Sequence, residues 1–319
     1  RGSRQDRVVT KIVWPPPPAP PRIGYVDQIT GEKDFPRRTS LLSRAATLLV
    51  GRRPEDGTFV RPIAVLVSEG GNVCIADPGA RAVFVYDKSR SVFQCLRQFG
   101  STQLLSPVAV ASVDSMDMLL VADSALGRVF AFTPRGKLLF TLSDGLERPA
   151  GLAVSGGRIC VSDSLRNQIA VFDLDGREIN RFGTRGNESG QFNCPTHLAS
   201  DSAGNLYVTD TMNFRVQVFD QNGRFLRFIG RQGDTSGRFS RPKGVAVDSF
   251  GHVYVTDGVF DNVQVFDTAG RFLLNWGQAG SEAGEFWLPV CISISKSNTI
   301  YVADSFNRRI QVFKYVGNE

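Results

Sequence analysis

One sequence pattern repeats six times along the chain, and this repetition constrains the fold more than any other feature. In the clearest copy, Asn205–Gly230, three strand-like runs are joined by two tight turns, and the first run ends in Asp. Repeats of about 40 to 47 residues are typical of propellers and solenoids, so one array is expected despite a length that would suit two domains. The repeated Asp residues are Asp77, Asp123, Asp163, Asp210, Asp257 and Asp304.

Each copy predicts four strands. A proline opens the copy, where a strand tolerates the missing donor, and a run of small apolar residues then suits a crowded innermost strand. Two further strands and an outer strand complete the unit, as in a propeller blade. The prediction is an all-β, six-bladed propeller over residues 61–319. The opening prolines are Pro62, Pro107, Pro149, Pro195, Pro242 and Pro289.

The last copy is incomplete, because it stops after its third strand, Ile310–Phe313. Residues 23–30, in contrast, form an isolated strand-like segment without a blade of its own. Pairing these two segments removes two exposed sheet edges and closes the ring. We therefore predict that residues 23–30 are the outer strand of the last blade, with Tyr25 close to Val312.

Two segments lie outside the predicted blades. Residues 1–22 are basic and then proline-rich, which predicts an extended polyproline II tether, with a ligand for a proline-reading domain as the alternative. Residues 31–60 are predicted to be a connecting segment with one short amphipathic helix before the first blade, over residues 40–51. A helix lying on a membrane surface is the alternative for that stretch.

The third strands carry a motif found in a known family. Residues 210–219 and 304–313 both read Asp-x-x-Asn-x-Arg-(Val/Ile)-Gln-Val-Phe. The motif resembles the NHL repeat, and the resemblance covers about residues 61 to 316. It implies a six-bladed NHL propeller. The whole chain further resembles exported bacterial NHL proteins, which are often lipid-anchored and whose activities are largely unassigned.

This resemblance implies a non-catalytic protein-interaction platform or scaffold in an exported assembly. The expected location is the periplasm, the outer membrane surface or the extracellular space. The expected partners are other proteins of the cell envelope, with redox proteins such as multihaem cytochromes among the candidates. No cofactor is predicted, because the five cysteines form no Cys-x-x-Cys pair and the chain carries no nucleotide-binding fingerprint. No apolar run is long enough to span a membrane.

The repeated Asp is interpreted as structural. Asp accepts backbone hydrogen bonds in turns and would tie the second strand of a copy to the third, and six near-equivalent copies cannot all be active sites. A second set of equivalent positions is expected to line the central channel, and it includes one histidine. Its members are Ala64, Ala109, Gly151, His197, Gly244 and Cys291.

Related six-bladed amidating lyases and lactonases hold a metal in the channel, so a metal-dependent channel lyase or hydrolase centred on His197 is one alternative function. One imidazole and one thiol are fewer than the three protein ligands that such a site needs, so no metal site is predicted. The other alternative is a single-stranded RNA-binding NHL domain. It rests on the net charge of +6 and on basic and aromatic residues in the loops at one rim, which suit phosphate contacts and base stacking. These residues are Arg81, Arg128, Arg166, Phe214, Arg215, Arg231, Lys243, Phe260, Phe306 and Arg308.

Overall fold

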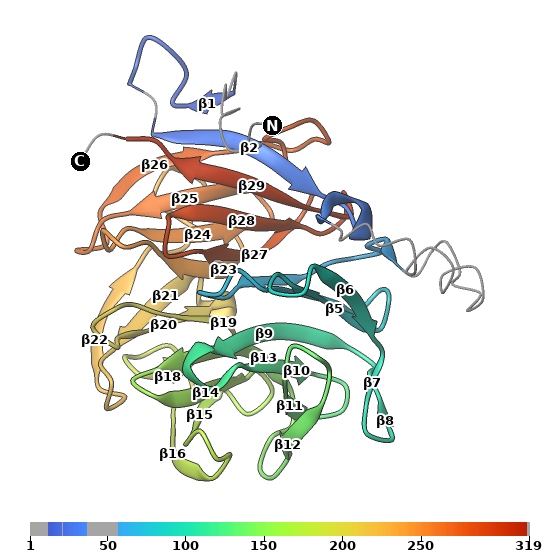
Figure 1. Cartoon of the computed structure of the whole chain (residues 1–319). Coiled ribbons are helices and arrows are strands. Elements are labelled where there is room, and N and C mark those ends of the chain that lie inside the picture. The colour runs from blue at the N-terminus through green and yellow to red at the C-terminus, as the bar shows by residue number, and fades with distance from the viewer. Residues whose placement is uncertain (1–11, 21, 37–56, 318–319) are drawn as a thin grey trace.

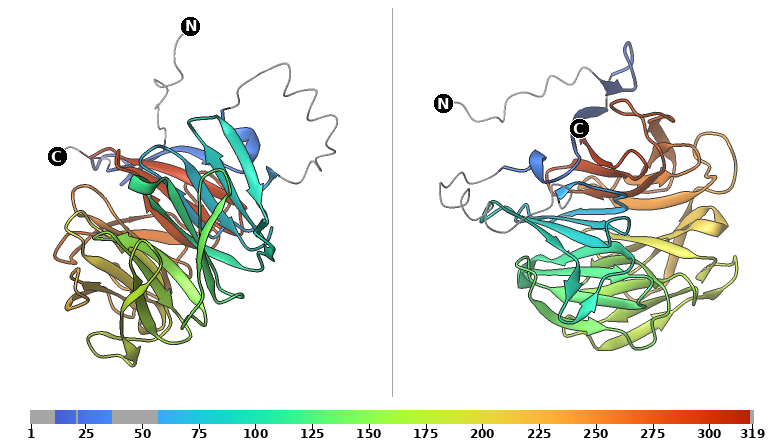
Figure 2. Two further views of the ribbon diagram at one scale, coloured as in Figure 1. Left: turned by 60° about the horizontal axis from the view of Figure 1, so that its bottom comes forward. Right: turned by 90° about the vertical axis from the view of Figure 1, so that its right-hand side faces the viewer.

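The computed structural model describes residues 12–20, 22–36 and 57–317. In this part of the chain, six main sheets are arranged around a central axis (Figures 1 and 2). Five of these sheets have four strands and the last has five. The prediction of an all-β, six-bladed propeller is confirmed. The short helix predicted at residues 40–51 lies outside the described residues.

Strands follow the chain from the axis outwards in the first five blades. Blade 1 comprises β3 (Ala64–Val67), β4 (Val73–Asp77), β5 (Ala82–Asp87) and β6 (Val92–Leu96). Blade 2 comprises β9 (Pro107–Val113), β10 (Met118–Asp123), β11 (Arg128–Phe132) and β12 (Leu138–Leu142). Blade 3 comprises β13 (Pro149–Ser155), β14 (Arg158–Asp163), β15 (Gln168–Phe172) and β16 (Glu178–Phe182).

Blades 4 and 5 repeat this arrangement. Blade 4 comprises β19 (Pro195–Ser200), β20 (Leu206–Asp210), β21 (Arg215–Phe219) and β22 (Phe225–Ile229). Blade 5 comprises β23 (Pro242–Val247), β24 (Val253–Asp257), β25 (Asn262–Phe266) and β26 (Phe272–Trp276). Two short ribbons stand between blades: β7 (Gln98–Phe99) with β8 (Thr102–Gln103), and β17 (Thr184–Arg185) with β18 (Gln191–Phe192). Short 3-10 turns occupy Glu32–Asp34, Asp114–Met116 and Thr211–Asn213.

Blade 6 is built from both ends of the chain. It contains β27 (Pro289–Ile294), β28 (Thr299–Asp304) and β29 (Arg309–Tyr315), and β2 (Ile23–Ile29) runs antiparallel beside β29. Tyr25 pairs with Phe313 and Asp27 pairs with Val312, with a register shift between them. The structure thus places the early strand where the ring must close, as predicted, and Figure 1 shows β2 beside β29.

The described part of the predicted tether differs from an extended spacer. Residues 13 and 14 form β1 (Val13–Trp14), which pairs antiparallel with the start of β2. The Trp14 ring packs edge-on against Phe313 with centroids 5.9 Å apart, and an added Cβ at Gly284 would collide with the same indole. Val13 and Trp14 therefore pack on blade 6, and we call residues 12–20 and 22 the arm. The proline-rich composition indicates an extended chain here, but it cannot show that residues 13 and 14 pair with β2.

Apolar side chains from adjacent blades form the core. One cluster joins Val216 and Val218 of blade 4 to Val253 and Val255 of blade 5. Another joins blade 1 to blade 6, which completes the ring. The second strands of blades 1, 2, 4 and 5 are buried along their whole length, because each blade face is covered by a neighbour. This burial on both faces explains why these strands lack alternation of apolar and polar residues.

Candidate interaction rim and central channel

The loops before the first strands and the loops between second and third strands lie at the same end of the propeller. In blade 4, for example, Pro195 at the start of β19 pairs with Asp210 at the end of β20. Both kinds of loop therefore emerge together at every blade. We call this end of the molecule the rim. Because rigid sheets position its loops, the rim is the natural place for a binding surface.

The six repeated Asp side chains lie at the rim and are fully buried. The carboxylate of Asp123 accepts the backbone N–H of Leu105 at 2.8 Å and that of Ser106 at 3.0 Å, in the loop entering blade 2. It also accepts the N–H groups of Ala125 and Leu126 at 3.1 Å, in the turn that follows β10. Each such carboxylate therefore joins three segments, and the loop before the first strand is a partner that the sequence pattern did not indicate.

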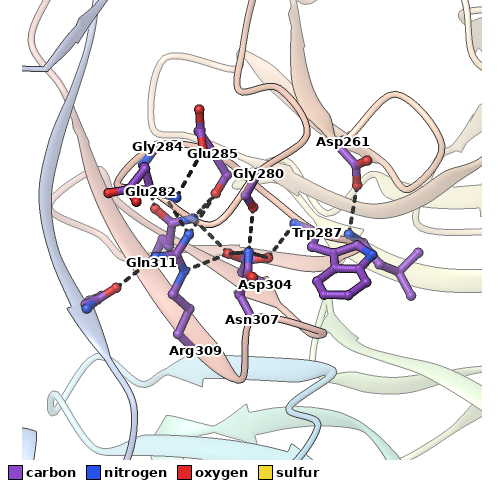
Figure 3. A network of polar contacts seen from close by, with 12 residues as sticks. Asp261, Gly280, Glu282, Gly284, Glu285, Trp287, Asp304, Asn307, Arg309 and Gln311 are labelled. Atoms are coloured by element: carbon purple, nitrogen blue, oxygen red, sulfur yellow. Dashed lines mark hydrogen bonds and ion pairs between the residues drawn. The ribbon is translucent and has the colours of Figure 1, made fainter.

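Blades 4 and 6 add side-chain donors to this arrangement, and Figure 3 shows them around Asp304. Arg309 Nε donates to Asp304 Oδ2 at 2.7 Å and Gln311 Nε2 donates to the same oxygen at 3.0 Å. The Asn307 amide and the backbone N–H of Trp287 complete the set. Arg309 is also buried and donates to the carbonyl of Glu282. A buried charge that is paired and hydrogen-bonded in this way avoids the large cost of an isolated one.

The rim also presents large apolar side chains to solvent. Trp287 is 58% exposed and Phe306 is 46% exposed, and their rings meet edge to face at 5.5 Å. Their counterparts in other blades lie either two residues after the repeated Asp or in the loop entering the blade. We call this set the collar. Its members are Val60, Leu105, Leu165, Met212, Val259, Trp287 and Phe306.

The buried Asp residues hold the backbone at five of the seven collar positions. The N–H groups of Val60, Leu105 and Trp287 donate to Asp carboxylates at 2.7 to 2.8 Å. Those of Leu165 and Val259 do so at 3.2 and 3.0 Å. The same carboxylates that stabilise the loops therefore fix the positions of exposed apolar residues.

The structure divides the ten predicted rim residues into two groups. Six are exposed: Arg81, Arg128, Arg166, Arg231, Phe306 and Arg308. Of these, Arg166 forms an ion pair with Glu147 at 2.9 Å. Arg81 and Arg308 lie four residues after the repeated Asp, where the turn requires a left-handed backbone with φ of 49° and 56°.

The other four predicted rim residues are only half-exposed. Arg215 Nε donates to buried Asp210 at 2.9 Å, and its guanidinium lies over the Phe228 ring, so this residue is structural. Phe214 packs against the core cluster between blades 4 and 5. Phe260 and Lys243 are half-buried, and burial together with nearby Arg241 lowers the pKa of Lys243. These four side chains are less available to a partner than their place in loops suggested.

Sequence reasoning missed most of the collar. Leu165, Met212 and Val259 stand at the same offset from the repeated Asp as Phe306, which was singled out. An apolar residue recurring in a turn, where polar residues are usual, was the available signal. Trp287 offered no such signal, because nothing in its neighbourhood shows that its ring faces solvent.

The innermost strands surround a cavity of about 230 Å³ at the axis. Of the six residues predicted to line the channel, His197 is among the lining residues, and the other five are buried beside it. Ala64, Ala109 and Cys291 are at most 2% exposed. Gly151 and Gly244 let neighbouring inner strands approach so closely that an added Cβ would overlap the next backbone. Small residues at these positions therefore allow the inner strands to pack closely around the axis. The cavity lies further along the same strands.

His197 makes contacts that reach blades 5 and 6. Its Nε2 lies 3.2 Å from Cys291 Sγ, and its Nδ1 accepts the backbone N–H of Val245 at 3.3 Å. The neutral imidazole must then carry its proton on Nε2 and donate it to the sulfur. The Cys291 thiol in turn points to the carbonyl of Val65 in blade 1. One pair of side chains thus connects four blades across the axis.

Burial lowers the pKa of His197 to about 4 and raises the pKa of Cys291 to about 12. Both groups are neutral near pH 7. The imidazole has no free lone pair facing the thiol, so it cannot act as a base toward Cys291, and the thiol is not activated as a nucleophile. Among the described residues, no group of three or more His, Cys, Asp or Glu side chains is placed to hold a metal ion. The geometry is that of a structural contact.

Comparisons with known proteins agree with this architecture. Residues 146–172 and 192–219 match the NHL repeat family, and residues 247–318 match a family described as a 6-bladed beta-propeller. The protein named brain tumor from Drosophila melanogaster is 28% identical over 137 residues, which is 40% of this chain. The matched part spans 13% of the length of that relative.

Solved structures with the same fold have low sequence identity. A streptogramin B lyase superimposes with a TM-score of 0.62 at 13% identity, covering 82% of this chain and 80% of the other. A Bacteroides thetaiotaomicron protein of unknown function gives 0.66 at 12% identity, with 92% and 75% covered. Hydrazine synthase of Kuenenia stuttgartiensis gives 0.58 at 14% identity, with 82% and 97% covered. At such identities the likeness concerns the fold alone.

Within the described residues, no helix has both the length and the apolar character that a membrane crossing requires. The repeats, the family matches and the ring of six sheets lead to one assignment. This chain is a six-bladed β-propeller that carries NHL repeats.

Proposed function

We propose that this protein is a non-catalytic interaction platform that binds a partner protein at its rim. An NHL propeller supports a protein-interaction scaffold in general. The observation that carries the rim assignment is the collar, since buried carboxylates hold the backbone of most of its residues while its apolar side chains remain in solvent. A surface fixed in this way loses little conformational entropy on binding, which favours affinity.

The chemistry of the rim indicates what the partner should offer. Trp and Arg are enriched among residues that dominate binding energy, and Trp287 stands beside Phe306 with exposed Arg308 two residues further on. Exposed arginines also occur in other blades, at Arg81, Arg128 and Arg231. We expect a partner surface with apolar anchors surrounded by carboxylates.

Quantitative crosslinking in the native source tests the proposal. The double variant Trp287→Ala/Phe306→Ala should recover a reproducible partner at a tenth of the unmodified level or less, as expected for loss of central anchors. The matched control is Met116→Ala/Phe250→Ala, which truncates exposed apolar residues at the other end of the propeller. Equal loss in both variants, or no loss in the first, would contradict docking at the rim.

Single-stranded RNA is the second candidate partner, favoured by the exposed arginines and the exposed Trp287–Phe306 pair. A titration with random single-stranded RNA separates the two candidates. Phosphate contacts release counterions, so RNA affinity must fall steeply as salt rises, whereas apolar docking persists. Absence of binding at low salt would eliminate the RNA candidate.

We propose an exported setting for this platform, with redox proteins of the cell envelope as candidate partners. Support comes from the resemblance of the whole chain to exported bacterial NHL proteins. Fractionation of the native cells, followed by identification of crosslinked neighbours, tests this setting. A purely cytoplasmic protein without envelope neighbours would refute it.

A further inference from the structure

A second cavity, of about 370 Å³, lies at the end of blades 5 and 6 that is remote from the rim. It is bounded by the arm, by the start of β2, by the middle of blade 5 and by the end of β29. Figure 1 shows the arm strand β1 at the outer side of β2 in this region. Small-molecule sites usually measure about 300–1,000 Å³, so the space is large enough for a ligand.

The walls of this cavity are apolar. Ile23 and Tyr254 are fully buried and Val265 is 3% exposed, so they form a rigid floor. Pro15 and Pro20 of the arm contribute another wall. Proline lacks a backbone N–H, so this wall offers no donor from those residues. The cavity therefore suits a hydrocarbon or aromatic body.

Its polar side chains are those of Arg22, His252, Tyr254 and Tyr315, and Arg22 Nη1 donates to the Tyr315 hydroxyl at 3.4 Å. Arg22 and His252 both line the cavity, and the lining residues include no Asp or Glu. The His252 ring lies between Phe250 and Tyr315, with centroids 6.0 and 5.6 Å away. Its Nδ1 bonds to Asp248 at 2.9 Å, which leaves Nε2 for another partner. The hydrogen bond to Asp248 raises the pKa of His252, whereas the nearby Arg22 charge lowers it.

Blade 4 carries a longer side chain at the position equivalent to Leu274. Arg227 and Leu274 occupy the same position, because each pairs with a valine of the third strand in its blade. The Arg227 guanidinium lies 6.0 Å from the centre of the Tyr207 ring, and its Nη2 is 3.3 Å from the Tyr207 hydroxyl. In blade 5 the shorter Leu274 lines the cavity instead. At this position blade 5 therefore carries a shorter and uncharged side chain than blade 4.

We propose that this cavity binds a small amphipathic carboxylate, whose apolar body lies against Leu274, Tyr254 and the arm prolines and whose carboxylate lies at Arg22 and His252. A guanidinium and an imidazole are both donors to such a group, and a planar carboxylate matches the guanidinium fork. The site is independent of the rim, so the fate of one proposal leaves the other unaffected.

Calorimetric titration of the full chain with decanoate tests the proposal, and saturable binding of one molecule per chain is expected. Decyl phosphate and decanamide distinguish the head group. Decanoate should bind about tenfold or more tightly than the neutral amide, because charge-assisted hydrogen bonds are lost with the amide. Tighter binding of the phosphate than of decanoate, equal binding of the amide, or no binding of decanoate would overturn the assignment to a carboxylate.

Two variants locate the site. Leu274→Arg should weaken decanoate about tenfold or more, because the longer side chain would occupy cavity volume that the apolar body needs, despite its added positive charge. Leu139→Arg is the control, because Leu139 is an exposed outer-strand leucine of blade 2. Arg22→Gln, at an exposed position, should weaken decanoate by a similar factor and leave decanamide unchanged. Unchanged decanoate affinity in either Leu274→Arg or Arg22→Gln would refute the proposal.

Discussion

The rim and the axis both bury polar groups, yet they treat charge in opposite ways. At the rim, Asp304 is fully buried and pairs with Arg309 at 2.7 Å, with further donors around it. At the axis, His197 meets a thiol and a backbone N–H, and burial lowers its pKa to about 4. Both groups are shielded from water, so burial alone does not decide charge. Asp304 keeps its charge because donors and a counter-ion surround it, whereas His197 is neutral because its surroundings carry no charge.

The largest expected effect is that of breaking the charged centre. Asp304→Ala should lower the free energy of unfolding by about 3–5 kcal/mol, because it leaves the buried Arg309 guanidinium without its counter-ion. Urea unfolding measures this loss. Asp123→Ala is the control, since Asp123 is held by backbone N–H groups, and about 1–3 kcal/mol is expected there. Equal losses would show that the ion pair adds nothing to the rim.

The next effect concerns acid. His197 has a folded-state pKa of about 4, below the ordinary value of 6.5. As pH falls below 6.5, His197 becomes protonated in the unfolded chain but stays neutral in the folded protein. The free energy of unfolding therefore decreases between pH 6.5 and 4. The loss is on the order of 3 kcal/mol. Unfolding measured across this range should show it, and His197→Asn should remove it. If His197→Asn shows the same dependence of unfolding free energy on pH, the loss of stability does not come from His197.

A smaller effect is expected from the thiol. Cys291→Ala leaves the Nε2–H of His197 without its acceptor and should lower the free energy of unfolding by about 1–3 kcal/mol. A double-mutant cycle of Cys291→Ala with His197→Asn isolates the contact, with a coupling of about 1 kcal/mol. The corresponding cycle of Asp304→Ala with Arg309→Met should give the larger coupling. A larger coupling energy for Cys291 with His197 than for Asp304 with Arg309 would contradict the proposed difference between the axis and the rim.

The smallest effect is that of His252, whose pKa is raised mainly by its hydrogen bond to Asp248. This contribution to stability is complete below the unfolded-state pKa and is lost as pH rises through the folded-state value, opposite in sign to that of His197. Because the His252 side chain is partly exposed, less than about 1 kcal/mol is expected. The difference in unfolding free energy between the protein and His252→Gln, followed from pH 5 to 9, should shrink with rising pH.

Much of the fold could be predicted because it depends on local repetition. The Asp that ends each second strand and the incomplete last copy together indicated the blade number and the ring closure. The position of Val13 and Trp14 could not be predicted, since it depends on pairing with a strand that is itself completed by the far end of the chain.

The candidate surface was harder to predict, because the direction of each side chain determines whether a loop residue is exposed at the rim. Arg215 opens β21 and turns inward to Asp210, whereas Arg308 stands in the preceding turn of its own blade and faces solvent. Both appear in sequence as basic residues next to a loop. The channel prediction placed His197 at the axial cavity, where the structure has it. The close approach of neighbouring strands at Gly151 and Gly244 depends on strand separation at the axis, which composition does not report.

Closure of the ring by β2 has a consequence for biosynthesis. Gln28 and Arg309, which bond across the closure, stand 281 residues apart in the chain. During translation β2 lacks its pairing partner, β29, until nearly every blade has emerged from the ribosome. An unpaired strand edge of this kind can pair with other nascent chains. Until the ring closes, the edge of β2 therefore stays open to association with other chains.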